Sequence, residues 1–182
     1  MMKKIMLLVL MIGMISGVEA ENTPQVWVQS TEITGFQSAV TALTAQTKLP
    51  ILFPLMFPAP ESNIDYYANF DTTPKGYDLY IDATPDCQGA KYCNIATLNA
   101  EGDAGPLPIY KNMQKKVMTS TVKLSNGQLA NYTPGFAMAD YWNPQIAWIQ
   151  DKVSYTLSWQ GLKSAKATEA ALKWMLTHLV NN

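Results

Sequence analysis

The chain has 182 residues, of which 48% are hydrophobic and 15% charged, and its formal net charge is −1. This length suits one domain with a hydrophobic core of its own. All 13 basic residues are lysines, so the chain lacks both the guanidinium group and the basic excess that hold a phosphate backbone. Nucleic acid is therefore not expected as a partner.

The first twenty residues have the three parts of a secretory signal peptide. Lys3 and Lys4 supply positive charge, an apolar run covers 5–15, and Val18-Glu19-Ala20 precedes a polar stretch. A run of about 11 residues is shorter than the ~20 that span a bilayer as a helix. No cysteine follows it to accept a lipid anchor. The sequence predicts cleavage after Ala20 and a single domain over 21–182, without a membrane span, in the periplasm or secreted.

A helix is predicted over 35–47. Thr34 and Gln37 have the spacing of a capping box, and apolar residues then recur at helical intervals. Pro50 ends the helix because it lacks an amide donor and restricts the residue before it. The next segment, 51–58, is apolar but broken by prolines, so we expect a short buried strand followed by a covering loop.

Alternation of apolar and polar residues predicts strands in the middle of the chain. It covers 64–70 and 77–82, and the turn at 72–76 favours antiparallel pairing of these two strands. A further strand is expected over 95–100, before a polar loop over 101–108.

Two more hairpins and a helix complete the prediction. Ser125-Asn126-Gly127 separates strands expected at 117–124 and 128–132, and Asn-Gly is a strong hairpin signal. Asp151-Lys152 separates strands expected at 146–150 and 153–159, and an apolar stripe predicts a helix over 165–180. The order of elements predicts an α+β domain: a twisted, mainly antiparallel sheet of about five to seven strands, with an N-terminal and a C-terminal helix packed on it.

Cys87 and Cys93 are the only cysteines. In an oxidising compartment a pair at this spacing is read first as a disulfide, and the short loop it closes gives about 2 kcal/mol of stabilisation. A redox or catalytic pair is the alternative, but the two-residue spacing of such pairs is missing.

No catalytic residue, metal site or cofactor is assigned from the sequence. The single histidine, His178, falls near the end of the last helix, where a cation interacts favourably with free carbonyl groups. No Gly-x-Ser-x-Gly turn is present to hold a nucleophile, and one histidine with two cysteines supplies a zinc site poorly.

Carboxylates are the remaining chemical groups. Asp78 and Asp82 share a strand face but stand roughly 13 Å apart, too far for a glycosidase pair, so we expect them on a solvated face. Asn99 to Asp103 spaces oxygen ligands as calcium loops do. An EF-hand is not completed, because Ala104 and Tyr110 occupy its sixth and twelfth positions.

An aromatic segment over 134–144 supplies the candidate binding residues Phe136, Tyr141 and Trp142. Exposed aromatic side chains of this kind are enriched among interface anchors. The alternative is that the segment folds back and covers one end of the core.

The chain resembles small bacterial proteins that carry a signal peptide and work in the periplasm or are secreted. The resembling features are 49–54 after a helix, the Cys-x5-Cys loop over 86–93, and Ile146-Ala147-Trp148 followed by Tyr155-Thr156-Leu157. The resemblance implies an α+β fold and an envelope or secreted location, and it implies no activity.

The leading hypothesis is a non-enzymatic periplasmic or secreted binding module for a protein, a peptide or envelope material. It follows from export, one disulfide and the lack of a recognisable catalytic motif. The alternative is a hydrolase that acts on cell-wall or extracellular polymers through Asp or Glu side chains.

Overall fold

The main element of the fold is one antiparallel sheet of seven strands. The computed structural model describes residues 27–58, 65–112, 115–124, 126–135, 143–160 and 165–181. Within them the sheet has the strand order β4-β5-β6-β10-β9-β8-β7. Its strands are β4 (Tyr67–Thr73), β5 (Gly76–Asp82), β6 (Asn94–Glu101), β7 (Ser120–Lys123), β8 (Leu129–Thr133), β9 (Gln145–Gln150) and β10 (Val153–Trp159). With two helices, the protein has the α+β fold expected from the sequence.

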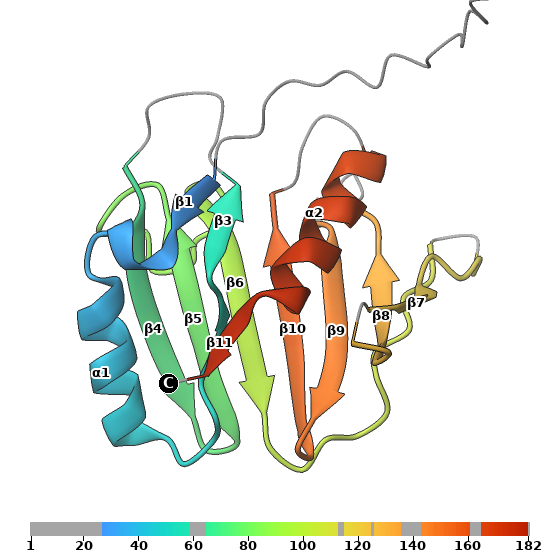
Figure 1. Ribbon diagram of the computed structural model, residues 1–182, viewed down its shortest axis with the longest axis horizontal. Coiled ribbons are helices and arrows are strands. Elements are labelled where there is room, and N and C mark those ends of the chain that lie inside the picture. The colour runs from blue at the N-terminus through green and yellow to red at the C-terminus, as the bar shows by residue number, and fades with distance from the viewer. Residues whose placement is uncertain are drawn as a thin grey trace, which may run out of the picture.

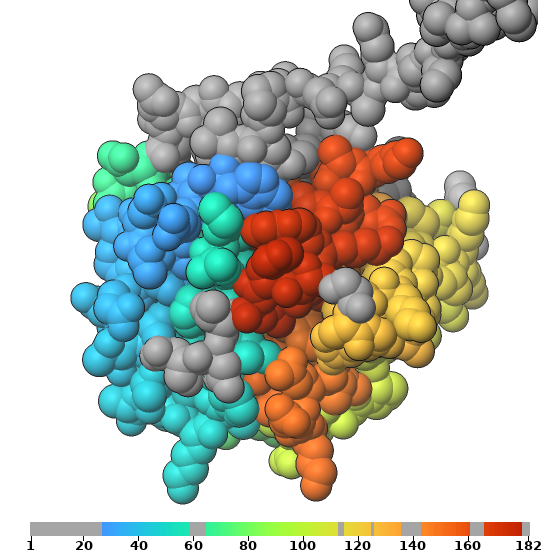
Figure 2. Space-filling model, in the orientation of Figure 1, coloured from blue at the N-terminus to red at the C-terminus, as the bar shows by residue number. Residues whose placement is uncertain are grey.

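Helices and two small sheets cover one face of the large sheet. The helix α1 (Phe36–Gln46) packs on β4, and α2 (Ala165–Thr177) packs on β9. Two short strand pairs lie between the helices. One joins β1 (Trp27–Gln29) to β3 (Met56–Pro58), and the other joins β11 (Leu179–Asn181) to β2 (Leu52–Pro54). The short helix η1 (Ser30–Glu32) leads from β1 toward α1. Figure 1 shows this layer in front of the strands, and in Figure 2 its blue, teal and red segments hide most of the sheet.

The hydrophobic core lies between the sheet and this covering layer. Successive strand residues point to opposite faces, so each strand contributes every second side chain to the core. The fully buried large side chains of the sheet are Tyr77, Leu79 and Ile81 on β5, Ile146 and Trp148 on β9, and Tyr155 and Leu157 on β10. The hydroxyl groups of Tyr77 and Tyr155 both donate to the carbonyl oxygen of Pro50, at 3.1 and 2.9 Å. These bonds attach the segment after α1 to the sheet.

The hairpins lie where the sequence predicts them. β4 and β5 pair across Pro74 and Lys75, and β9 and β10 pair across Asp151 and Lys152. β7 and β8 are joined through Asn126 and Gly127, and the latter has the positive φ that this turn requires.

Three sequence predictions are corrected. Thr34 does not cap α1: its backbone bonds to Tyr66 and Ala68 at the edge of β4, and Gly35, with φ of 78°, precedes the helix without a side-chain cap. The segment expected as a covering loop forms β3, because the N-terminal strand β1 pairs with it. The last helix ends at Thr177 instead of 180, because the following residues form β11 and pair with β2.

Candidate functional site

The face of the large sheet opposite the helices is polar, and we call it the outer face. Strand register places two rows of side chains across it. One row runs Asn69, Tyr80, Thr97, Ser158, Gln145 and Thr133. The next runs Asp71, Asp78, Asn99, Thr156, Ala147, Asn131 and Thr121. Along β5, β6 and β10 these residues are half-buried, whereas their inward neighbours are almost fully buried. This contrast is the pattern of a sheet with one covered and one open face.

Asp82 anchors one end of the outer face. It is completely buried (0% exposed), which corrects the expectation of a solvated side chain. Its Oδ2 accepts from Asn69 Nδ2 at 3.0 Å and from the Gly89 amide at 3.3 Å, and its Oδ1 accepts from Asn94 Nδ2 at 2.9 Å. A buried carboxylate is retained only when donors replace water, and these three neutral donors do so.

The Cys87–Cys93 disulfide predicted from the sequence is present. The loop that it closes folds back on β5, because the Gly89 amide bonds to Asp82 and Gly89 lies against the ring of Tyr80. A Cβ atom at position 89 would stand 2.5 Å from that ring, and φ of 74° also favours glycine there. The loop presents Tyr92 to solvent with 87% of its surface exposed.

Asp71 on β4 and Asp78 on β5 stand directly opposite each other on the outer face. Such residues have Cα atoms about 4.5–5.5 Å apart, and like charges at this spacing are destabilising. Within the described part of the chain neither carboxylate has an ion-pair partner. Asp71 accepts from the Tyr80 hydroxyl at 3.3 Å, and Asp78 accepts from Asn99 Nδ2 at 2.9 Å. Burial, together with the charges of Asp78 and Asp71, raises the pKa of Tyr80, so its hydroxyl stays protonated and can donate.

The other end of the outer face carries exposed apolar side chains. Residues near Pro108 and Thr119 lie on β8, because Asn131 Nδ2 donates to the Pro108 carbonyl at 3.3 Å and Thr119 and Thr133 share a hydroxyl hydrogen bond of 2.9 Å. Four large apolar residues of this region are exposed to solvent: Ile109 (63%), Val117 (50%), Leu129 (60%) and Ile149 (38%). Exposed apolar residues mark an interaction surface where they form a contiguous patch.

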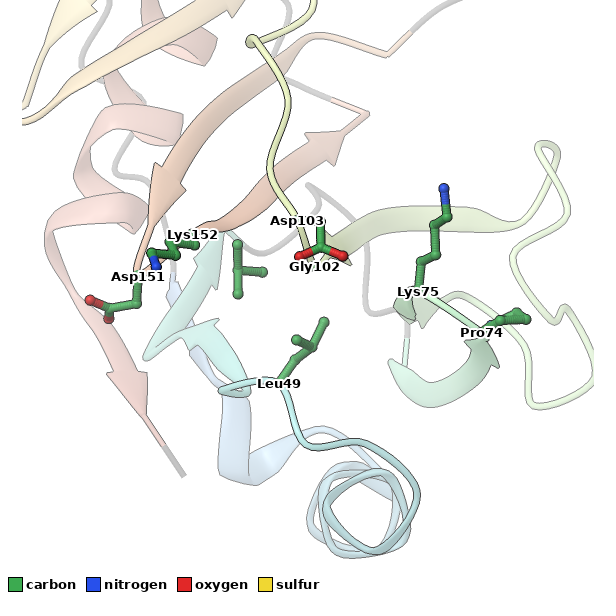
Figure 3. Close-up of a pocket in the computed structure, with 8 residues that line it drawn as sticks. Leu49, Pro74, Lys75, Gly102, Asp103, Asp151 and Lys152 are labelled. Carbon is green, nitrogen blue, oxygen red and sulfur yellow. The ribbon is translucent and has the colours of Figure 1, made fainter.

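A cavity of about 370 Å³ lies at the end of the sheet where three chain reversals meet. Figure 3 shows Gly102 and Asp103 between the Asp151–Lys152 turn on one side and Pro74–Lys75 on the other. Asp103, Asp151 and Lys152 have positive φ values of 56°, 50° and 65°. Two backbone bonds join the reversals, from Gly102 N to Lys75 O and from Ala104 N to Lys152 O.

This cavity fits small-ligand binding poorly. Pockets of that kind are mostly apolar, whereas charged side chains of both signs line this one beside Leu49, Pro74 and Val153. The positive φ values of Asp151 and Lys152 are those of the β9–β10 hairpin turn, so we assign the cavity a structural role.

The structure places the other candidate residues as follows. Phe136, Tyr141 and Trp142 lie outside the described residues. His178 is exposed and stacks on Trp174 at 3.9 Å between ring centroids, and its Nδ1 lies 2.9 Å from the Trp174 carbonyl oxygen. Asn99 and Asp103 are separated, since Asn99 bonds to Asp78 on the outer face and Asp103 lines the cavity.

The described residues contain no group of three or more His, Cys, Asp or Glu side chains placed to hold a metal ion. None of the helices in the described part of the chain is long and apolar enough to cross a membrane.

Sequence reasoning missed the outer face as a candidate surface. The available signal was the composition of the strand positions between the apolar ones, which carry mainly Asp, Asn, Ser, Thr and Tyr, with few lysines and glutamates. Which of these positions become neighbours depends on the strand order, and β6 pairs with β10 across more than fifty residues of sequence.

Comparison with known proteins brings out no similarity: no family model matches the sequence, no curated protein matches it, and no solved structure matches the fold.

Proposed function

We propose that the protein is a non-enzymatic binding module of the periplasm or the secreted fraction, and that the outer face of its large sheet is the recognition surface. The observation that carries the proposal is the Asp71–Asp78 pair. Two like charges in register reduce stability, and such a pair on an open surface is expected where binding is selected over stability.

The rest of the outer face supports the same use. Its hydroxyl, amide and carboxylate groups offer donors and acceptors to a partner, and the disulfide-closed loop holds Tyr92 in solvent at its edge. A rigid tyrosine contributes contact area at low entropic cost. The partner class is a protein, a peptide or envelope material, and the signal-like sequence over 1–20 supports an exported location.

The test is a binding measurement with a blocked outer face. Thr156 lies in the middle of this face on β10, so Thr156→Arg places a long charged side chain where a partner would pack. Co-sedimentation with purified cell-wall sacculi and capture of proteins from an exported fraction should both be measured for this variant. The expected result is loss of whichever binding the wild type shows. Ala45→Arg, on the exposed side of α1, is the matched control and should bind as the wild type does.

The second candidate is a carboxylate-dependent hydrolase, and the same Asp71–Asp78 pair is the observation that favours it. Side chains directly opposite each other in register can bring two carboxyl groups to the spacing of about 5–5.5 Å that retaining glycosidases use. The pair stands on an open face, however, with Asp71 exposed, whereas glycosidases enclose their substrate. Turnover of a panel of saccharide polymers that Asp71→Asn or Asp78→Asn abolishes would establish the hydrolase and overturn the binding module.

A further inference from the structure

The two ends of the outer face carry opposite charge. Asp71 on β4, Asp78 on β5 and Glu101 on β6 form what we call the acidic end. Beyond β10 the composition reverses, since residues 104–139 contain no acidic side chain. The basic end consists of four exposed lysines, Lys111, Lys115, Lys116 and Lys123.

Hydrogen bonds and register place the basic end on the outer face. Lys123 follows the buried, inward-pointing Val122 on β7, so its side chain points outward. Lys111 pairs with Val117 in the short hairpin that lies on β8. Lys115 and Lys116 belong to the tip of the same hairpin, where both backbone amides bond to Asn112.

The acidic and basic ends are too far apart to neutralise each other within one molecule. Three strand spacings separate β6 from β8 and five separate β5 from β7, which is about 14 Å and 24 Å at roughly 4.8 Å each. Screening by physiological salt acts over about 8 Å. Each end is therefore available to a charged partner.

The middle and the basic end of the outer face suit contact with a second sheet. The central strand β10 carries only small outward side chains, Ser154, Thr156 and Ser158, which allow another sheet to approach closely. Beside the lysines stand the exposed apolar residues Ile109, Val117, Leu129 and Ile149. Burial of such residues stabilises an interface, while the lysines set its orientation.

We propose that the partner of the outer face is a second copy of this chain, packed face to face about a twofold axis along β10. This inference rests on the proposed function. β10 is the middle strand of seven, so the rotation places β4 over the partner's β7 and β5 over the residues that lie on the partner's β8. The acidic end of each copy then meets the basic end of the other, twice, in a closed dimer.

The area of the face is sufficient for such a dimer. Seven strands are roughly 30 Å wide and seven residues of β10 are about 23 Å long, which gives about 700 Å² per copy. Over β8, residues near Pro108 and Thr119 form this surface in place of the strand. Stable complexes bury about 800 Å² per partner. The side chains that rise above the mean plane of the sheet increase the area that each copy can bury beyond this estimate.

The test is exchange of charge between the two ends. Variant one carries Asp71→Lys with Asp78→Lys, and variant two carries Lys116→Glu with Lys123→Glu. The mass of each protein in solution is measured by light scattering at increasing concentration. The control for a change of charge away from the outer face is Lys48→Glu, which lies beyond the end of α1. We expect wild type and control to reach twice the chain mass and each variant alone to remain monomeric. An equimolar mixture of the two variants should dimerise again, because opposite charges meet at both contacts.

A wild type that stays monomeric at high concentration would overturn self-pairing, and so would a dimer that persists in both variants or a mixture that fails to dimerise. Circular dichroism checks the fold, and the single changes Asp71→Lys and Lys123→Glu replace any double variant that does not fold. The result is separate from that of the proposed function. A monomeric wild type that binds sacculi or exported proteins, and loses that binding in Thr156→Arg, leaves the binding module standing with a different partner.

Discussion

Asp82 shows how a single buried side chain organises part of the outer face. Its carboxylate receives three hydrogen bonds, from Asn69, Asn94 and the Gly89 amide, and so joins β4, β5, β6 and the disulfide loop. No lysine takes part, so the stability of the arrangement depends on the complete set of donors.

We predict that Asp82→Asn lowers the free energy of unfolding by about 2–3 kcal/mol. The amide has the same shape, but its NH₂ group would face donors where the carboxylate accepts, and hydrogen bonds to charged groups are the costly ones to lose. Chemical denaturation at neutral pH measures the change. The matched control is Asp71→Asn, which should not lower stability: Asp71 is exposed, and loss of its charge relieves the repulsion with Asp78, a gain of at most about 1 kcal/mol. Equal changes in the free energy of unfolding for the two variants would show that the hydrogen bonds of Asp82 do not stabilise the fold more than an exposed aspartate does.

Tyr155 makes the stability of the folded protein depend on pH in the alkaline range. Burial, with a smaller contribution from the charge of Asp151, raises its pKa from 10.0 to about 12. The folded state therefore holds the proton more tightly than the unfolded chain. The stabilisation is complete below pH 10 and is lost as the pH rises through about 12.

We predict a corresponding change in Tyr155→Phe. At neutral pH the variant should lose about 1 kcal/mol, because the hydrogen bond to Pro50 disappears. Between pH 10 and about 12 its stability should fall less steeply than that of the wild type. Urea unfolding at several pH values tests this, and curves that stay parallel throughout would contradict it. Tyr92→Phe is the control at neutral pH, since its hydroxyl lies in solvent and its loss should be nearly neutral.

At the scale of the elements, the β9–β10 hairpin turns through two residues that both have positive φ. A type I′ turn requires this conformation, and Asn-Gly is its preferred sequence. The chain instead has Asp151 and Lys152. Aspartate tolerates the left-handed region, but a lysine there costs roughly 1–2 kcal/mol.

Lys152→Gly should therefore stabilise the protein by about 1 kcal/mol. The backbone bond from Ala104 to the carbonyl of residue 152 is kept, because it does not involve the side chain. The midpoint of thermal unfolding measures the gain. Lys123→Gly, within β7, should act in the opposite direction, because glycine weakens a strand. A loss of stability in Lys152→Gly would mean that the lysine side chain makes a contact that compensates for the strain.

The sequence was sufficient to predict most individual elements, because local patterns determine them. Alternation identified β5 and β10, and Asn126-Gly127 identified the β7–β8 hairpin. The errors arose where pairing between distant segments decided the outcome. β3 forms because β1 reaches it, and β11 shortens the last helix because it pairs with β2.

The same reasoning applies to the candidate surface. Asp82 was expected on a solvated face because it shares that strand face with Asp78. Its hydrogen bonds with the Gly89 loop and with the side chains of Asn69 and Asn94 accompany its burial instead. The separation of charge across the outer face also depends on β10 lying between β6 and β9, which no local pattern indicates.

At the scale of the whole molecule, the protein has a covered face that holds the fold together and an open, polar face that we propose as the recognition surface. The core, the strand pairs that fix both ends of the described chain, and the helices all lie on one side. The acidic end, the basic end and the exposed apolar side chains lie on the other. A partner of any kind should therefore change the accessibility of outer-face residues and leave the helix side unchanged.

Carbodiimide labelling of carboxyl groups, followed by peptide mass analysis, tests that claim most directly. Labelling rates would be compared between dilute protein and concentrated protein to which an exported extract has been added. Protection of Asp71, Asp78 and Glu101 with no change at Glu32, which is exposed beside the helices, is the predicted result. Protection of Glu32 with unchanged labelling of the three outer-face carboxylates would contradict the assignment of the outer face as the recognition surface.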